Sequence, residues 1–363
     1  MIYLNYAALH PTHPDAQRES TRTITEFKQF LYSDAGIEWY FRKVNACRQK
    51  VSKLLHISDP STIAFCSNAS SASYLTLSSI QWEPEDTVLT TTHENPSTTR
   101  QILALKKRGV HIYAIQPSSP DQFLESIRQA LQQHSVKVII LSHVSHVDGR
   151  ILPISLISTM AREQGAMFFV DGAQAVGQIP VNLDQLDFDV YFFTGHKWCA
   201  GPLGTGAIVL NHHFLNSAIR RPIQSTEGLT TQAAEFEIGT QNIGDTAGLA
   251  HACELKFTGG LDTEMLLKYR QKTKKIFEES HAVRFVEWTG PHAPGILTIQ
   301  GFKALDYRRF AKKLEEESNI IIKPFVDYPQ EILPALRLSW STTMNDQDFQ
   351  FGVEKIAGSF SNA

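Results

Sequence analysis

Cysteine is scarce in this chain of 363 residues. Its four cysteines, Cys47, Cys66, Cys199 and Cys253, stand far apart and form no C-x-x-C pair. Disulfide frameworks and zinc sites need cysteines at short, regular spacings, so the sequence supports neither. His212-His213 has no third ligand nearby, and we expect no metal site.

The chain also lacks an excess of one charge and any long apolar run. Lys and Arg number 34 against 37 Asp and Glu, so we expect no large basic surface and no nucleic-acid partner. No stretch approaches the roughly 18 apolar residues of a membrane-spanning helix, and residues 1–6 do not resemble a signal peptide. We therefore expect a cytoplasmic protein with a small-molecule partner and no membrane association.

Between residues 62 and 210, short β-rich runs alternate with helical stretches such as 121–133 and 154–164. This alternation is typical of an α/β domain with helices on both faces of a mainly parallel sheet. Residues 138–141 are all apolar, as in a strand buried on both faces. The sequence predicts strands at 62–66, 87–91, 110–115, 136–142, 166–170, 189–193 and 205–210.

The pattern changes after about Gly260. There we expect a helix at 262–279, short strands near Phe285 and Ile296, an amphipathic helix at 304–316, two more short strands and a closing helix. No repeat or linker interrupts the chain. We therefore predict a large domain of residues 15–255, packed closely against a smaller α+β domain of residues 256–363 with the N-terminal arm 1–14.

Polar residues directly follow three of the predicted strands. Ligands in open α/β sheets bind beyond the carboxyl ends of the strands. Residues 67–73, Ser-Asn-Ala-Ser-Ser-Ala-Ser, follow the first strand and open a helix, where free N–H groups can hold a phosphate. A simple helix cap and turn is the alternative, and it is favoured if nothing else agrees.

The other two strand ends carry Asp171-Gly172-Ala173-Gln174 and Thr194-Gly195-His196-Lys197. A carboxylate at one strand end and a lysine at the next match the needs of pyridoxal phosphate. The lysine forms the Schiff base, and the aspartate keeps the pyridine nitrogen protonated. A plain ion pair between neighbouring strand ends is the competing interpretation.

These two segments, with Trp198 after Lys197, resemble the class V aminotransferases, which include cysteine desulfurases, cystine C–S lyases and isopenicillin N epimerases. Residues 3–8 are similar to the family's N-terminal arm, and residues 236–242 to its segment that reaches into the neighbouring subunit's site. The resemblance covers nearly the whole chain. It implies the fold type I of pyridoxal-phosphate transferases, with a seven-stranded sheet, and a homodimer with shared active sites.

The resemblance also implies individual roles. Lys197 would be the Schiff-base lysine and would move the proton at the substrate α-carbon, Asp171 would pair with the ring nitrogen, and Gln174 would contact the ring hydroxyl. Phosphate contacts would come from Ala69, Ser70, Thr194 and His196, with Thr240 from the second subunit.

Arg337 lies in Ala335-Leu336-Arg337-Leu338-Ser339-Trp340, a predicted short strand of the small domain. Its guanidinium fork could clamp a carboxylate, and the resemblance implies that it binds the substrate α-carboxylate. An isolated arginine is more often a surface ion-pair partner.

Two positions depart from the family pattern. Asn95 stands where the family commonly stacks a histidine on the cofactor ring, and His93 lies two residues too early. An amide can cover the ring but does not easily relay protons. A similar change occurs in lyases that resemble the ergothioneine-pathway sulfoxide C–S lyases. His146 replaces an asparagine near the ring hydroxyl, where it either donates the same hydrogen bond or is a polar residue without cofactor contact.

A third departure concerns the reaction. A persulfide-forming desulfurase needs a thiolate on a mobile loop of the C-terminal region, but no cysteine follows Cys253, and residues 323–329 contain none. Cys199 begins the turn behind Lys197 and is expected to point into the fold.

The sequence therefore favours β-elimination on a cysteine-derived amino acid, that is, a C–S lyase of amino-acid metabolism. Aminotransfer and epimerisation remain alternatives, because they start from the same cofactor adduct. A cysteine desulfurase and a non-catalytic cofactor-binding protein are less favoured.

Overall fold

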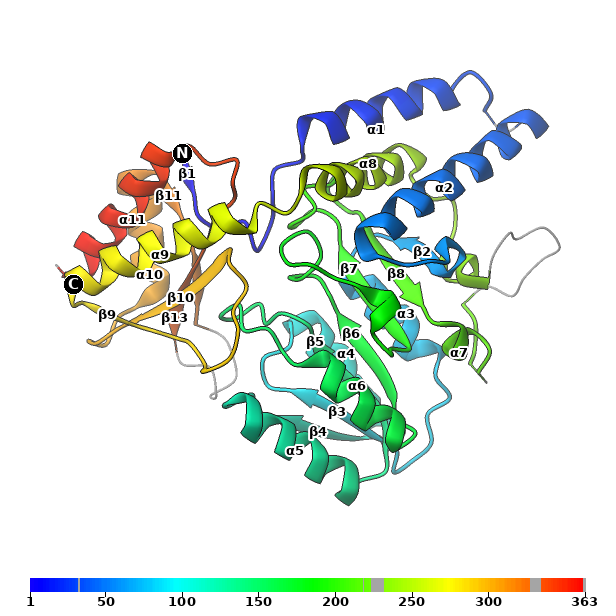
Figure 1. Cartoon of the computed structure of the whole chain (residues 1–363), viewed down its shortest axis with the longest axis horizontal. Helices are drawn as coiled ribbons and strands as arrows, with labels where there is room; N and C mark the ends of the chain where they lie inside the picture. Colours follow the sequence, from blue (N-terminus) through cyan, green and yellow to red (C-terminus); the bar gives the residue numbers. More distant parts are fainter. Residues whose placement is uncertain (32, 218, 223–231, 327–333, 362–363) are drawn as a thin grey trace.

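The computed structural model describes residues 1–31, 33–217, 219–222, 232–326 and 334–361 (Figure 1). A seven-stranded sheet, in the order β2-β8-β7-β6-β5-β3-β4, forms the centre of the larger part. Its strands are β2 (Ile63–Cys66), β3 (Thr87–Thr91), β4 (His111–Ile115), β5 (Val136–Ser142), β6 (Met167–Asp171), β7 (Val190–Thr194) and β8 (Gly206–Leu210). All seven predicted strands are confirmed, with each end within one residue of its predicted position.

The central strands run parallel, and β8 pairs antiparallel with both β2 and β7. Successive side chains of β5 enter cores on opposite faces of the sheet: Ile139 and Leu141 on one, Val138 and Ile140 on the other. The apolar run at 138–141 therefore is a strand covered on both faces, as predicted.

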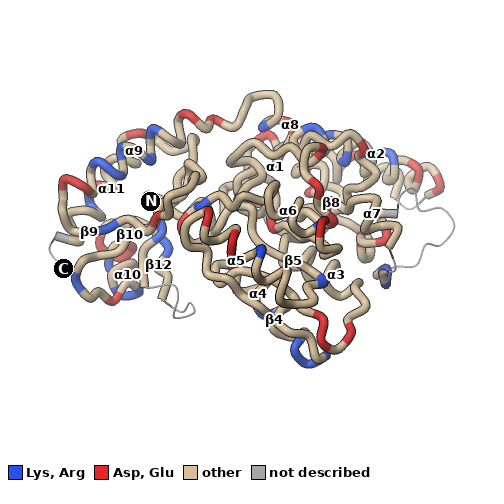
Figure 2. Tube along the Cα trace, turned by 60° about the horizontal axis from the view of Figure 1, so that its bottom comes forward, with Lys and Arg blue, Asp and Glu red and all other residues tan. Residues whose placement is uncertain are grey.

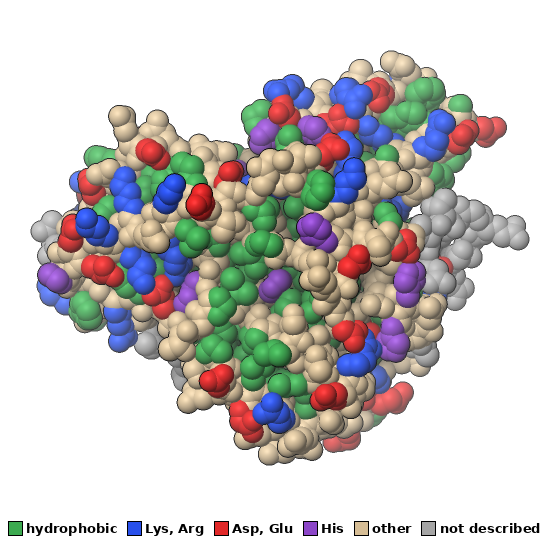
Figure 3. All heavy atoms as spheres, in the orientation of Figure 1, with side chains coloured by type: hydrophobic (Ala, Val, Ile, Leu, Met, Phe, Trp, Pro, Cys, Tyr) green, Lys and Arg blue, Asp and Glu red, His purple; other side chains and the backbone are tan. Residues whose placement is uncertain are grey.

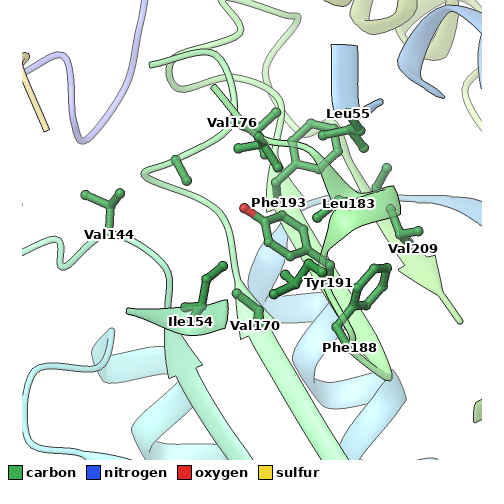
Figure 4. Close-up of a cluster of buried hydrophobic side chains, with 14 of the residues drawn as sticks. Leu55, Val144, Ile154, Val170, Val176, Leu183, Phe188, Tyr191, Phe193 and Val209 are labelled. Carbon is green, nitrogen blue, oxygen red and sulfur yellow. The ribbon is translucent and has the colours of Figure 1, made fainter. Parts of the chain in front are cut away.

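Helices cover both faces of this sheet (Figure 1). The core on the first face includes Tyr191, which packs beside Val170, Phe188 and Phe193 (Figure 4). The helices that contribute to it are α2 (Asp34–Leu55), α5 (Pro120–Gln133), α6 (Ile154–Glu163) and α8 (Ile243–Gly259). Those on the second face are α3 (Ala69–Ser79), α4 (Pro96–Ala104) and α7 (His212–Leu215).

Glycines of α8 allow α1 (Pro14–Phe27) to approach it closely. A Cβ atom on Gly244 would lie 2.4 Å from Cγ1 of Ile24, and one on Gly248 would lie 2.9 Å from the carbonyl oxygen of Ala16. Larger residues would force the two helices apart. The sequence patterns did not predict α1, α2 or α8.

The chain after Gly260 builds a second, smaller unit, shown in yellow to red in Figure 1. Its antiparallel sheet has the order β12-β13-β10-β9 and packs with Trp340, Phe277 and Phe349, which are fully buried. The elements are α9 (Thr263–Ser280), β9 (Val283–Phe285), β10 (Ile296–Gly301), α10 (Tyr307–Ser318), β11 (Ile320–Ile321), β12 (Lys323–Phe325), β13 (Ala335–Ser339) and α11 (Asp346–Ser361). The prediction of two further strands was one short, because the two-residue β11 has too little sequence to show a period.

The N-terminal arm joins the two units. β1 (Ile2–Tyr3) pairs parallel with β11, and the amide of Ala7 donates to the Ser339 hydroxyl. Further along, the amide of His10 donates to the carbonyl of His196 in the large unit. The division into residues 15–255 and residues 256–363 with the arm 1–14 remains our proposal.

Acidic and basic residues are interspersed along the trace in Figure 2, and neither sign dominates the face seen in Figure 3. Among the described helices, none combines the length and the apolar character that crossing a bilayer requires.

Candidate active site

A buried pocket lies at the carboxyl ends of the central strands, where the strand-end rule predicts a ligand. It collects eight residues that the sequence singled out, from the start of α3, the turn after β3, and the ends of β5, β6 and β7. Its lining is Ala69, Ser70, Asn95, Thr98, Ser142, Val144, His146, Asp171, Ala173, Gln174, Thr194 and Lys197. His196, Thr240 and Arg337 are not part of this lining.

Lys197 lies three residues beyond the end of β7. Desolvation lowers the pKa of its amine to about 8, although the carboxylate of Asp171 opposes the shift and Arg337 adds to it. Within the described ranges, the amine forms no hydrogen bond or ion pair. An amine of this kind is partly neutral near pH 7 and is available as a nucleophile and base.

Asp171 is the last residue of β6 and is buried. Its Oδ1 accepts a hydrogen bond of 2.8 Å from the amide of Ala173. Burial raises the pKa of this carboxyl, while Lys197 and the Ala173 amide lower it. A further positive charge in the pocket would favour the carboxylate, so the site suits a cationic ring nitrogen.

The start of α3 is prepared for an anion. Asn68 caps the helix by accepting from the amide of Ser71 at 2.9 Å, and the Ser71 hydroxyl accepts from the amide of Asn68. The Ala69 amide donates to the Thr194 hydroxyl at 3.0 Å and is therefore already used. The hydroxyl protons of Ser70 and Thr194, with the positive end of α3, can serve a phosphate.

His196 follows Thr194 by two residues in the chain. Its Nδ1 accepts from the amide of Gly204 at 3.3 Å, which places the proton of the neutral ring on Nε2. Burial lowers the pKa of His196 to about 4, so the ring stays neutral at pH 7. Its contact with a phosphate remains a prediction and would be made through Nε2.

Gln174 is held from two sides. Its Nε2 donates to the carbonyl of Ala7 at 2.9 Å, and the indole of Trp198 donates to its Oε1 at 2.6 Å. Each amide atom keeps one further hydrogen-bonding position. The N-terminal arm therefore fixes the side chain that the resemblance assigns to the ring hydroxyl.

Asn95 lines the pocket and also caps α4, because its Oδ1 accepts from the amide of Ser97 at 3.0 Å. Its amide NH₂ group is then left for the pocket. His93 is buried outside the pocket lining, and burial lowers its pKa to about 4. The structure thus places Asn95, not His93, in the pocket.

His146 lines the pocket, and its ring edge packs against Phe325. Burial and the charges of Arg337 and Lys197 hold the pKa of this imidazole well below its usual value. Its role toward a cofactor remains open between the two interpretations above.

Arg337 lies on β13, as predicted, and is buried. Its Nη1 donates to the carbonyl of His146 at 2.7 Å, and its Nη2 donates to Oδ1 of Asn5 at 3.1 Å. The guanidinium carbon lies 5.3 Å from the centre of the Phe325 ring. Binding of a substrate carboxylate by Arg337 remains a prediction.

Thr240 lines a different pocket, with Cys66, Tyr74 and Thr205. At this location Thr240 lies outside the pocket of its own chain. Its contact with the phosphate in a second subunit's site stays a prediction. Cys199 is buried and its thiol faces the carbonyl of Val176, which confirms that it points into the fold.

Sequence reasoning missed five residues at or beside the pocket. Ser142 and Ala173 stand at or just after strand ends, so the strand-end rule could have found them. Val144 and Glu94 lie two and three residues after the ends of β5 and β3, so the same rule could have found them. Thr98, inside α4, carries no such signal.

A lysine and an aspartate at adjoining strand ends are the pair that a pyridoxal-phosphate enzyme needs, and together with this sheet they indicate that class. The chain belongs to the class-V aminotransferase family, whose model matches residues 36–324.

Similar proteins include a probable cysteine desulfurase of Pyrococcus abyssi (30% identity over 243 residues, 63% of this chain and 59% of that one). A probable cysteine desulfurase of Methanothermobacter thermautotrophicus is 23% identical over 342 residues, 89% of this chain and 83% of that one. The match to the Pyrococcus relative thus spans less than two thirds of its length.

Two solved structures share the fold. The apo cysteine desulfurase of Thermococcus onnurineus NA1 superposes with a TM-score of 0.86 at 20% identity, over 100% of this chain and 95% of that one. The cystine C–S lyase C-DES, in complex with its reaction product cysteine persulfide, has a TM-score of 0.85 at 21% identity, over 98% of this chain and 97% of that one.

Proposed function

We propose that this enzyme is a pyridoxal-phosphate-dependent C–S lyase that cleaves the Cβ–S bond of a cysteine-derived amino acid by β-elimination. The observation that carries the proposal is the Lys197 amine, free of hydrogen bonds from the described residues and close to Asp171 in one buried pocket. The same chain has no cysteine after Cys253.

The residues of the pocket fit the cofactor. Lys197 would hold it covalently, Asp171 would face its ring nitrogen, and Ser70, Thr194 and His196 would hold its phosphate. When bound, pyridoxal phosphate supplies an electron sink for the electron pair that remains at the substrate α-carbon.

The side chains then divide the work. Arg337 binds the substrate α-carboxylate and orients the Cβ–S bond. The Lys197 amine, which the substrate amine would displace from the cofactor, takes the proton from Cα, and the electron pair of the Cβ–S bond leaves with the sulfur. Addition of water to the remaining three-carbon fragment gives pyruvate and ammonia.

The thiols support elimination over sulfur transfer to the protein. Burial raises the pKa of the Cys47 and Cys66 thiols to about 12, so neither is a ready thiolate. Cys199 and Cys253 are buried in the core. The segment where a persulfide loop would lie, 323–329, has no cysteine in its sequence, and its residues 327–329 lie outside the described ranges.

A cysteine desulfurase is the second candidate, favoured by the names of both relatives above. The product separates the two reactions. Desulfuration of cysteine returns a proton to Cβ and yields alanine, whereas elimination yields pyruvate and ammonia.

The experiment incubates protein loaded with pyridoxal phosphate with L-cysteine, L-cystine and an S-alkyl-cysteine sulfoxide, and measures pyruvate, ammonia, thiol and alanine. We expect pyruvate and ammonia in equal amounts from at least one substrate, and none from Lys197→Ala. Alanine as the product would establish the desulfurase. A keto acid that retains the sulfur substituent would indicate aminotransfer, and loss of optical rotation without products would indicate epimerisation.

We further propose a cytoplasmic homodimer. Tyr74 and Ile238, which line the pocket with Thr240, are 61% and 58% exposed in the single chain. Apolar side chains exposed next to such a pocket suit burial by a second copy. Sedimentation should give twice the mass of 40.7 kDa, and a monomer that retains full activity would contradict the shared site.

A further inference from the structure

Glu94 is a buried carboxyl that the proposed mechanism does not use. It lies in the turn between β3 and α4 and is 3% exposed. The Thr91 hydroxyl lies 2.6 Å from its Oε1, and the Ser142 hydroxyl lies 2.6 Å from its Oε2. No cation among the described residues pairs with it. A buried carboxyl whose partners are two hydroxyls and the backbone of Ser142, with no cation, is poorly solvated when ionised.

Ser142 connects Glu94 to the pocket. It is the last residue of β5, lines the pocket, and pairs in register with Asp171 at the end of β6. The negative charge of Asp171 reaches Glu94. Two carboxyls that interact in this way do not ionise independently, and one of them keeps a proton over part of the pH range.

The surroundings decide which carboxyl keeps it. Asp171 has the Lys197 cation and the Ala173 amide, both of which favour its ionised form. Glu94 has only Thr91 and Ser142, and burial with the field of Asp171 raises its pKa to about 7. The neighbouring His93 is neutral, because burial lowers its pKa to about 4. Glu94 is therefore the carboxyl that holds the proton.

The proton on Glu94 changes what Ser142 offers the pocket. A protonated Glu94 can donate to the Ser142 oxygen, whose own hydrogen then turns toward the pocket. An ionised Glu94 accepts the Ser142 hydrogen, so that only lone pairs of the serine face the pocket. The presence or absence of the Glu94 proton therefore changes two things together: the charge near Asp171 and the hydrogen bond that Ser142 offers the pocket.

We propose that Glu94, through Ser142 and Asp171, is a positioning residue that sets how tightly the cofactor ring nitrogen keeps its proton. This inference rests on the proposed binding of pyridoxal phosphate at Lys197. An ionised Glu94 adds negative charge behind Asp171 and strengthens the hold on the ring proton. A neutral Glu94 weakens that hold. The direct contact with the ring stays with Asp171.

The first test needs no cofactor. An infrared pH titration of the apo-protein should show the stretch of a buried protonated carboxyl that disappears near neutral pH and is missing in Glu94→Gln. Thr91→Val removes one donor to the carboxylate and should move this transition upward by about one pH unit. Thr90→Val is the matched control, because the buried Thr90 hydroxyl has no partner among the described residues and should leave the transition in place.

The second test follows the ¹⁵N NMR shift of the ring nitrogen against pH in protein loaded with ¹⁵N-labelled pyridoxal phosphate. We expect Glu94→Gln to lose the ring proton at a pH lower by on the order of one unit, since the ionised state behind Asp171 is absent. Thr90→Val should follow the wild type. If Glu94→Gln does not fold, Thr91→Val still has to move the carboxyl transition to higher pH and the loss of the ring proton to lower pH, because it keeps Glu94 neutral over a wider range.

The outcomes separate the two proposals. If the carboxyl transition occurs near neutral pH but the cofactor ring nitrogen titrates alike in Glu94→Gln and in wild type, the role of Glu94 is overturned. The lyase proposal then still stands. An apo-protein in which Glu94 is already ionised at pH 5 overturns it as well. If no cofactor binds at Lys197, the proposed function and this inference both fail.

Discussion

The lowered pKa of Lys197 predicts how fast the apo-protein captures its cofactor. Only the neutral amine attacks the cofactor aldehyde. With its pKa lowered from 10.5 to about 8, roughly one Lys197 amine in eleven is neutral at pH 7, against about one in three thousand for an ordinary lysine. The capture rate should therefore gain about 300-fold from the pKa shift alone.

Stopped-flow absorbance measures this capture when apo-protein is mixed with pyridoxal phosphate. Dividing by the rate for N-acetyl-lysine, expressed per neutral amine so that its own titration at about pH 10.4 is taken out, removes the titration of the cofactor itself. The rate of capture by the protein should rise about tenfold per pH unit below 8 and level off above it. In Asp171→Asn the plateau should begin at a lower pH, because the charge that raises the pKa of Lys197 is gone. A rate that keeps rising through pH 10 would refute the reasoning.

Three further predictions concern binding and stability. Arg337→Met should lower kcat/KM by a factor equivalent to about 2–5 kcal/mol, mainly through KM, while the cofactor absorbance persists. In Gly172→Ala the new Cβ would lie 2.2 Å from Cε1 of the buried Tyr191 ring, so urea unfolding should show a loss of about 1–3 kcal/mol, and an unchanged midpoint would contradict that packing. The raised pKa of Glu94 stabilises the fold fully below pH 4.5, and this contribution is lost as pH rises to about 7. Relative to Glu94→Gln, the apo-protein should therefore lose about 3 kcal/mol of unfolding free energy across that window, and parallel stability curves would contradict the shift.

The strands of the large sheet could be predicted because burial on both faces leaves continuous apolar runs between polar ends. The α8 helix could not be predicted from the sequence. It is rich in Ala and Gly and is buried on most sides by α1 and α2, so it has no polar face to reveal a helical period. Its glycines, which read as helix breakers, are needed for close contact with Ile24 and Ala16.

The candidate site likewise contains residues that the sequence could predict and residues that it could not. Asp171 ends β6 and Lys197 lies three residues after β7, so the alignment of these parallel strands brings them together. Glu94 comes near Asp171 only through the turn after β3 and its contact with Ser142. Nothing in the local sequence signals that contact, because it joins segments 48 residues apart.

The arrangement of the N-terminal arm has a consequence for how the protein is made. The arm leaves the ribosome well before its partners, so β1 must wait for β11 and Ala7 must wait for Ser339, whose contact spans 332 residues. The contact of Gln174 with Ala7 spans 167 residues, and the contact of Arg337 with Asn5 spans 332, so Arg337 cannot be held by the arm until β13 has emerged. Contacts so distant in sequence form late in folding. A truncated nascent chain can therefore fold much of its large sheet without a finished pocket, and synthesis of β13 determines when the enzyme can first bind its substrate.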